Sequence, residues 1–370
     1  MALVDILNYA GKRKKLRPAG LILHGFATHF RLSTLVRLAG RRLVTAPSGS
    51  AVLSLAGNDF TATLSDPVEL YRAMKYGIET LDFDIFVLMV DLSVEAEVLG
   101  CELKFHPHNV PDVVSHPVKT LEDAKNLRLP DPMRDGRMPV FLKALELITA
   151  NYTLLKSATV IGPFTLASHL IGSEIYLDMR KNREKVKATL EHCQRFATIW
   201  GRALAQAGAD YIAIADPAAS QLSPQLYEEF SQPYTTNLIR SLPRPCVLHV
   251  CGKAGHLIGK MAQSGAVGLS IDEVDIAKAI DQVPRNVVIL GNIGPIRIKL
   301  RAAEEIRAET LALLDVVKSR REYIVCAGCD LAPETPKENI ISFIEAVRSR
   351  PKSISGLSKT ESKQNPSPPP

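Results

Sequence analysis

A histidine and a cysteine with one residue between them, His249 and Cys251, end an apolar run that begins at Cys246. If this run is a β-strand, residues two apart point to the same side, so the imidazole and the thiol can reach one metal ion. A core histidine beside a buried cysteine would give the same pattern. The spacing therefore raises a metal site as a hypothesis that a further ligand must support.

A further thiol is available at the end of the last apolar run, where Cys326 and Cys329 occur. Two buried cysteines or a Cys-x-x-Cys redox motif are the alternatives. The redox motif needs a helix directly after its first cysteine, whereas the next helix is expected only near Pro336. One thiolate from here would complete a His/Cys/Cys set, and three protein ligands with an open fourth position are typical of catalytic zinc.

Acidic residues follow other apolar runs. Asp91 and Glu95 are four residues apart and could share one face of a helix, although acids in a first helical turn also simply stabilise the helix. Asp216 follows another run, where it could orient a ligand or cap a turn. We expect these three residues to be candidates for catalysis.

Three further residues follow the sixth and seventh apolar runs. Glu273 could supply a fourth zinc ligand in the resting state, and Gly291 with Asn292 are expected to contact a cofactor. Polar groups after five different runs are a stronger indication of a site than any one of them.

The elements that would position these residues are eight apolar runs separated by helical patterns. Runs that are apolar on both faces indicate buried parallel strands. Eight strands, each followed by a helix, predict a single (β/α)8 barrel, in which chemistry lies at the carboxyl ends of the strands. A doubly wound sheet is the alternative, but the chain has no Gly-x-Gly-x-x-Gly or Walker loop. The predicted strands are 20–24, 84–90, 158–162, 211–215, 246–250, 267–271, 287–290 and 323–326, and the predicted helices are 67–80, 141–154, 183–207, 224–242, 255–264, 276–282, 301–319 and 336–348.

Composition limits the class of protein. The chain has 370 residues, 46% of them hydrophobic, 23% charged, with a net charge of +6 and no dense basic stripe, so nucleic-acid binding is not expected. Six cysteines, no secretory signal and no long apolar run predict a cytoplasmic protein that neither enters nor crosses a membrane. Residues 351–370 are rich in Pro, Ser and Lys and predict a disordered tail after a barrel domain spanning 1–350.

Several motifs, taken in order, resemble the uroporphyrinogen decarboxylase superfamily, and within it the zinc-dependent methylcobalamin methyltransferases. The resemblance extends from about residue 60 to residue 348. The matching segments are TLSDP (63–67), DLSVEAEVLG (91–100), GPFTLA (162–167), GAD (208–210), DPAAS (216–220), HVCG (249–252), GLSIDE (268–273), GNIGP (291–295) and GCDLAPETPKENI (328–340).

The resemblance implies a barrel in which His249, Cys251 and Cys329 occupy the zinc positions and Cys326 is a buried neighbour. It also separates two chemistries. The decarboxylases use no metal and begin with an Arg-Gln-Ala-Gly-Arg-Tyr segment, which the arginine-rich stretch at 31–42 does not reproduce. The usual family segment before the first strand is degenerate here at 16–20, so roles for residues 1–60 cannot be transferred.

The mechanism implied is attack of a zinc-bound thiolate on the methyl group of methylcobalamin, because coordination to zinc deprotonates a thiol. The corrinoid would come on a separate corrinoid protein, and the small-molecule acceptor would be a thiol such as coenzyme M or, by Lewis-acid activation, tetrahydrofolate. Asp91 and Glu95 are expected at the barrel mouth. Two alternatives remain. One is a tetrapyrrole decarboxylase, and the other is a non-catalytic barrel that binds a corrinoid protein and in which zinc has a structural role.

Overall fold

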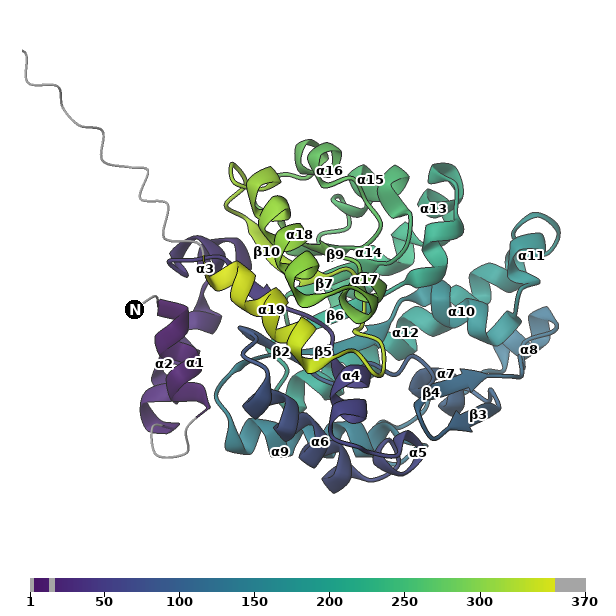
Figure 1. Cartoon of the computed structure of the whole chain (residues 1–370). Helices are drawn as coiled ribbons and strands as arrows, with labels where there is room; N and C mark the ends of the chain where they lie inside the picture. The colour runs from purple at the N-terminus through teal and green to yellow at the C-terminus, as the bar shows by residue number, and fades with distance from the viewer. Residues whose placement is uncertain (1–2, 13–16, 350–370) are drawn as a thin grey trace, which may run out of the picture.

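Eight parallel strands form the central sheet of the computed structural model, which describes residues 3–12 and 17–349. Their order is β1-β10-β9-β8-β7-β6-β5-β2. The two end strands meet as well, because the Asp84 amide donates to the Val44 carbonyl at 2.8 Å and the Thr45 hydroxyl to the Ile85 carbonyl at 2.8 Å. The sheet is thus closed, and the predicted (β/α)8 barrel is confirmed (Figure 1). The strands are β1 (Leu43–Thr45), β2 (Ile85–Val87), β5 (Leu155–Ile161), β6 (Tyr211–Ala215), β7 (Cys246–Val250), β8 (Gly268–Ile271), β9 (Val288–Ile293) and β10 (Tyr323–Ala327).

The predicted first strand is wrong. Residues 20–24 lie within helix α2 (Arg17–His29), and the first barrel strand is β1, which has only three residues and therefore leaves little pattern in the sequence. After α2, helix α3 (Leu32–Leu38) buries Leu32 and Leu35 against the amino ends of the barrel strands. The N-terminal segment thus forms the floor of the barrel.

Helices surround the sheet and follow most strands (Figure 1). Predictions at 67–80, 183–207 and 276–282 match observed helices. The predicted helices 224–242 and 255–264 are each divided in two, 301–319 corresponds to the single shorter helix at 303–316, and the hairpin of β3 (Leu103–His106) with β4 (Asn109–Val113) was not predicted. The remaining bounds are α1 (Leu3–Gly11), α4 (Gly49–Leu55), α5 (Phe60–Thr63), α6 (Pro67–Thr80), α7 (Val94–Val98), α8 (Leu121–Lys125), α9 (Met138–Asn151), α10 (Pro163–Ile171), α11 (Ile175–Lys181), α12 (Arg183–Ala207), η2 (Pro217–Gln221), α13 (Pro224–Phe230), α14 (Gln232–Ser241), η3 (Ala254–Leu257), α15 (Ile258–Met261), α16 (Ile276–Gln282), α17 (Pro295–Leu300), α18 (Ala303–Val316) and α19 (Lys337–Arg348).

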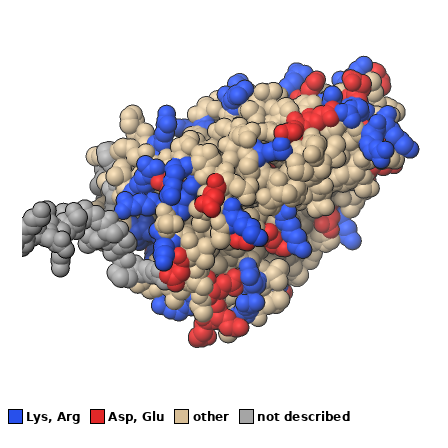
Figure 2. All heavy atoms as spheres, turned by 90° about the horizontal axis from the view of Figure 1, so that it is seen from above, with Lys and Arg blue, Asp and Glu red and all other residues tan. Residues whose placement is uncertain are grey.

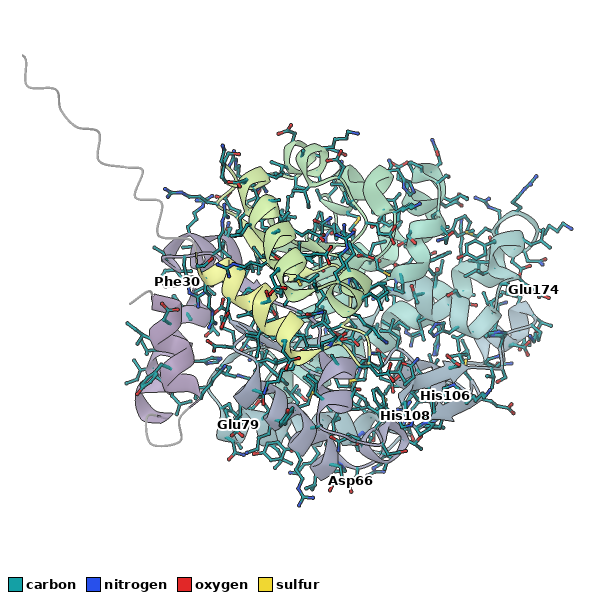
Figure 3. All side chains as sticks on the ribbon, viewed as in Figure 1. Phe30, Asp66, Glu79, His106, His108 and Glu174 are labelled. Atoms are coloured by element: carbon teal, nitrogen blue, oxygen red, sulfur yellow. The ribbon has the colours of Figure 1, made fainter. Side chains whose placement is uncertain are left out.

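Local sequence explains where the helices begin and end. Asp66, labelled in Figure 3, accepts the Val68 and Glu69 amides before α6, and Pro67 occupies the first helical position. Before α19 the Thr335 hydroxyl donates to the Ala332 carbonyl, and Pro336 is the capping residue.

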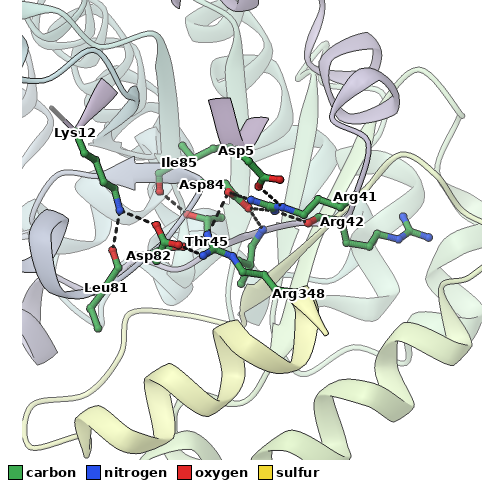
Figure 4. A network of polar contacts seen from close by, with 11 residues as sticks. Asp5, Lys12, Arg41, Arg42, Thr45, Leu81, Asp82, Asp84, Ile85 and Arg348 are labelled. Atoms are coloured by element: carbon green, nitrogen blue, oxygen red, sulfur yellow. Dashed lines mark hydrogen bonds and ion pairs between the residues drawn. The ribbon is translucent and has the colours of Figure 1, made fainter. Parts of the chain in front are cut away.

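A buried ion pair fastens the floor to the barrel (Figure 4). Both terminal nitrogens of Arg41 donate to Asp84 at 2.7 Å, and Arg41 Nε donates to Asp5 on α1. Asp84 also accepts the Val44 amide of β1 at 2.8 Å. Arg41 directly precedes β1, so this arginine serves the amino end of the barrel, away from the end where ligands are expected.

The outer surface mixes both charges. Figure 2 shows Lys and Arg side chains interspersed with Asp and Glu over most of one face. Within the described ranges, the helices are too short or too polar to cross a membrane. The predicted tail at 351–370 lies outside the described residues.

Candidate functional site

Three residues predicted as zinc ligands come together at the carboxyl end of the barrel. His249 lies on β7, Cys251 directly follows it, and Cys329 follows β10. One ligand atom from each lies within 4.8 Å of the other two, and all three side chains are half-buried. Two thiols and an imidazole are the donors that zinc prefers, and three protein donors leave one position open. The donor set therefore fits a catalytic zinc ion.

The imidazole of His249 is oriented by its neighbour on β8. Ser270 lies opposite His249 in the strand register, and its hydroxyl is 3.0 Å from His249 Nδ1. This contact leaves Nε2 for the metal. Partners of this kind fix the ring and the tautomer of a metal-binding histidine.

Replacing Ser270 by alanine should weaken zinc binding by about 10–100-fold, the usual effect of losing such a partner. Competition with a chelator of known affinity measures this change. Ser270→Thr keeps the hydroxyl and should retain most of the affinity. Equal zinc affinity in Ser270→Ala and the parent protein would show that the contact does not orient the ligand.

A hydrogen bond links the thiol groups of Cys251 and Cys329. A hydrogen bond from Cys329 lowers the pKa of Cys251, while the same bond and burial raise the pKa of Cys329. One thiolate is thus already favoured in the protein, and a cation would favour the second. Cys326, predicted as a buried neighbour, is buried and lies outside the ligand group, as expected.

Asp272 lies between the two ligand-bearing loops. Its Oδ2 accepts the Gly252 amide at 3.0 Å, next to Cys251. On the other side, a β-carbon at Gly328 would lie 2.0 Å from Asp272 Oδ1, so only glycine fits beside Cys329. Asn292 in turn donates to the carbonyls of Asp272 and Val274 at 2.7 Å.

Asn292 and Gly291, expected to contact a cofactor, therefore have another place in the structure. Asn292 holds the loop that carries Asp272. Gly291 packs against β8, where a β-carbon would lie 2.8 Å from the Ile271 carbonyl oxygen, and its own carbonyl accepts the Tyr323 hydroxyl. Glu273, expected as a fourth ligand, is exposed and is not brought into the ligand group.

Asp91 does not share a helical face with Glu95. It precedes α7 and accepts Arg137 at 2.5 Å and the Ser93 amide and hydroxyl at 2.9 and 2.6 Å. Arg137 also donates to Glu97. Because these groups satisfy one another and Asp91 is buried outside the lining of the barrel cavity, its carboxylate has a structural place beside the strand end.

Glu95 turns the other way and is buried. Its Oε1 accepts the Ile161 amide at 2.9 Å, and burial raises its pKa from 4.5 to about 7. Below pH 7 the folded protein thus holds a proton that the unfolded chain releases near pH 4.5.

This carboxyl group should make the protein less stable as the pH rises from about 4.5 to 7, because the unfolded chain binds fewer protons over that range. The loss is roughly 3 kcal/mol above pH 7. Glu95→Gln keeps the acceptor for the Ile161 amide and should remove this loss. Urea unfolding of both proteins at pH 5 and pH 8 tests the prediction. Equal pH dependence in both would contradict it.

Asp216 is buried behind the strand ends and is fully bonded. It accepts the Thr165 amide and hydroxyl at 2.8 and 2.6 Å and the Ser231 hydroxyl at 2.9 Å. Burial raises its pKa. The residue ties α10 to α14, and its carboxylate does not line the barrel cavity.

A cavity of about 130 Å³ extends from the ligand group into the barrel. His249, Cys251 and Cys329 lie in its wall, and Leu32 of the floor helix closes its far end. Among the described residues that line it there is no Lys or Arg. The cavity was not predicted from the sequence. The segment 270–273 was considered only for an acidic zinc ligand, so the roles of Ser270 and Asp272 were not predicted either. The only sequence signal for these two residues is their place at the end of β8.

Comparison with known proteins agrees with this architecture. Residues 35–350 match the family model described as uroporphyrinogen decarboxylase (URO-D). The methylcobamide:CoM methyltransferase MtbA of Methanosarcina acetivorans is 30% identical over 294 residues, covering 77% of this chain and 85% of that protein. The uroporphyrinogen decarboxylase of Geobacter sulfurreducens is 29% identical, covering 85% and 92%.

A solved methyltransferase from Methanosarcina mazei superimposes with a TM-score of 0.78 at 25% identity, covering 86% of this chain and 98% of the other. The fold, the family model and the relatives lead to one conclusion. The chain belongs to the uroporphyrinogen decarboxylase (URO-D) family.

Proposed function

We propose that this protein is a zinc-dependent methyltransferase that moves a methyl group from a methylated corrinoid to a thiol. The observation that carries the proposal is the His249, Cys251 and Cys329 group, whose ligand atoms lie within 4.8 Å of one another and face the barrel cavity. The relatives named as methylcobamide:CoM methyltransferases support the same reaction class.

When bound, zinc would deprotonate an acceptor thiol at its open position and keep the sulfur nucleophilic. In the transfer, the acceptor sulfur forms a bond to the methyl carbon. The cobalt–carbon bond breaks with its electron pair left on cobalt, and the thiol proton has already been released to solvent. Two cysteine thiolates suit this chemistry because they leave the metal centre without net charge.

The protein's own residues orient the reactants. Ser270 contacts the His249 ring, and Asp272 accepts a hydrogen bond from the Cys251 loop and packs against Gly328 beside Cys329. A corrin ring is far larger than a cavity of about 130 Å³, so the donor must bind at the barrel mouth. A separate corrinoid protein covering this mouth, as the family resemblance implies, would bring the methyl group to the sulfur and exclude water.

A decarboxylase of an acidic tetrapyrrole is disfavoured by the charges. The described cavity walls offer no Lys or Arg for substrate carboxylates. Arg41 is bonded to Asp84 at the opposite end of the barrel, and Arg42 donates to the carbonyls of Val317 and Arg320. Tetrahydrofolate is a weaker acceptor candidate than a thiol, since its nitrogen gains less from an electron-rich zinc site.

The test is methyl transfer from free methylcobalamin to a thiol, followed by the absorbance change of the corrinoid. Zinc-loaded protein should catalyse the transfer, and zinc-free protein should not. A fully zinc-loaded protein that transfers no methyl group would overturn the proposal. Zinc-independent release of carbon dioxide from uroporphyrinogen would favour the decarboxylase instead.

A further inference from the structure

The interior of this barrel is hollow where such barrels are normally packed with bulky side chains. Small residues point inward from several strands, so the middle layer leaves space beneath the ligand group. The larger residues Tyr211, Val247 and Leu290 lie nearer the amino ends of the strands, where Leu32 closes the cavity. The small inward residues are Ser157, Thr159, Ala213, Ala215, Ser270 and Cys326.

The wall of this cavity is mainly apolar and carries no positive charge. Apart from the ligand group, Asp330 is the acidic side chain among its described lining residues. Its Oδ1 is buried and has no hydrogen-bond partner among the described residues. Asp272 stands close by, between the two ligand loops. An anion entering here would meet acids and apolar groups.

The buried cations around the barrel are already paired. Arg137 is held by Asp91 and Glu97, and Lys156 donates to the Leu154 carbonyl at 2.8 Å and lies 3.2 Å from Asp210. Zinc offers no net charge either once two thiolates bind it. A sulfonate or carboxylate on the acceptor would therefore enter the cavity without a cationic partner, which is unfavourable.

Building on the proposed methyl transfer, we propose that the acceptor is a thiol with an uncharged, mainly apolar tail that fills the barrel cavity. An apolar cavity of about 150 Å³ holds one benzene molecule, so this cavity suits a tail of about five or six carbon atoms. The preference would differ from that of relatives named for coenzyme M, whose tail is a sulfonate.

Binding to zinc-loaded protein tests the tail separately from catalysis. Proton release and heat on adding 1-butanethiol, 2-mercaptoethanesulfonate or cysteamine report whether each sulfur binds the metal centre. The neutral thiol should bind at least ~10-fold more tightly than either charged one, the difference equivalent to one uncompensated charge at a partly hydrated site. Equal or tighter binding of a charged thiol would overturn the tail assignment alone. Binding of none would overturn the proposed function and the tail assignment with it.

A charge introduced at the cavity mouth provides the second test. Leu92 lines the cavity and is only half-buried, so a lysine there can reach solvent with its amine. Leu92→Lys should shift the affinity ratio by about tenfold toward the sulfonate. Leu92→Gln, polar but uncharged, should leave the ratio as it is. If the two variants give the same ratio, the missing cation does not set the preference.

Discussion

Cys329→Ser should lower methyl transfer by about 10³-fold, equivalent to roughly 4 kcal/mol of lost stabilisation at the reacting sulfur. The variant loses one of three protein ligands, and a hydroxyl is a poor replacement for a thiolate toward zinc. Zinc content after dialysis and the initial rate with methylcobalamin should fall together. His249→Ala and Cys251→Ser should behave in the same way.

The matched control is Cys246→Ser, on the same strand as His249. Cys246 is buried, lies outside the ligand group, and donates to the Arg244 carbonyl, a bond that a serine hydroxyl can also make. This variant should keep both zinc and activity. If Cys329→Ser retained the parent rate and one zinc per chain, the ligand assignment would be wrong.

Arg137→Met should lower the free energy of unfolding by about 3–5 kcal/mol, because it leaves a buried carboxylate without its partner. The side chains of Arg137 and Asp91 are 7% and 1% exposed, and they are 2.5 Å apart. Urea denaturation measures the loss. Zinc content per folded chain should not change, since Asp91 lies outside the ligand group.

The double variant Asp91→Asn with Arg137→Met isolates the pair. Removing the charge of Asp91 should make the double variant more stable than Arg137→Met alone. If the double variant were less stable by the sum of the two single effects, the two residues would not be coupled. If a variant lost zinc but kept its free energy of unfolding, the result would indicate that Asp91 contributes to the metal site.

The three candidate metal ligands could be proposed from the sequence because each follows or ends an apolar run. His249 lies on β7, Cys251 directly follows it and Cys329 follows β10, so barrel geometry places all three at the same end of the barrel. The resemblance to the family was still needed to choose Cys329 over Cys326. Seven of the eight predicted strands are present in the structure. They could be predicted because buried parallel strands are continuous apolar runs in the sequence. The first strand was misplaced because β1 has three residues and α2 contains the stronger apolar run.

The roles of the acids could not be predicted, because they depend on partners far away in the chain. Asp91 is bonded to Arg137, and Asp216 is bonded to Thr165 and Ser231. These partners are not at a regular sequence separation, so no pattern in the sequence indicates the contacts. The cavity was missed for a related reason. It arises from small residues on several strands, each of which is unremarkable by itself.

The most direct test of the central claim is zinc X-ray absorption on the loaded protein, with and without a thiol. A catalytic zinc ion held by His249, Cys251 and Cys329 should show two sulfur ligands at about 2.3 Å and one imidazole nitrogen, with a third sulfur appearing when 1-butanethiol is added. If the ligand shell of zinc does not change at a saturating thiol concentration, the zinc site is closed and structural. That result would contradict activation of the acceptor by zinc and favour a non-catalytic role for the barrel.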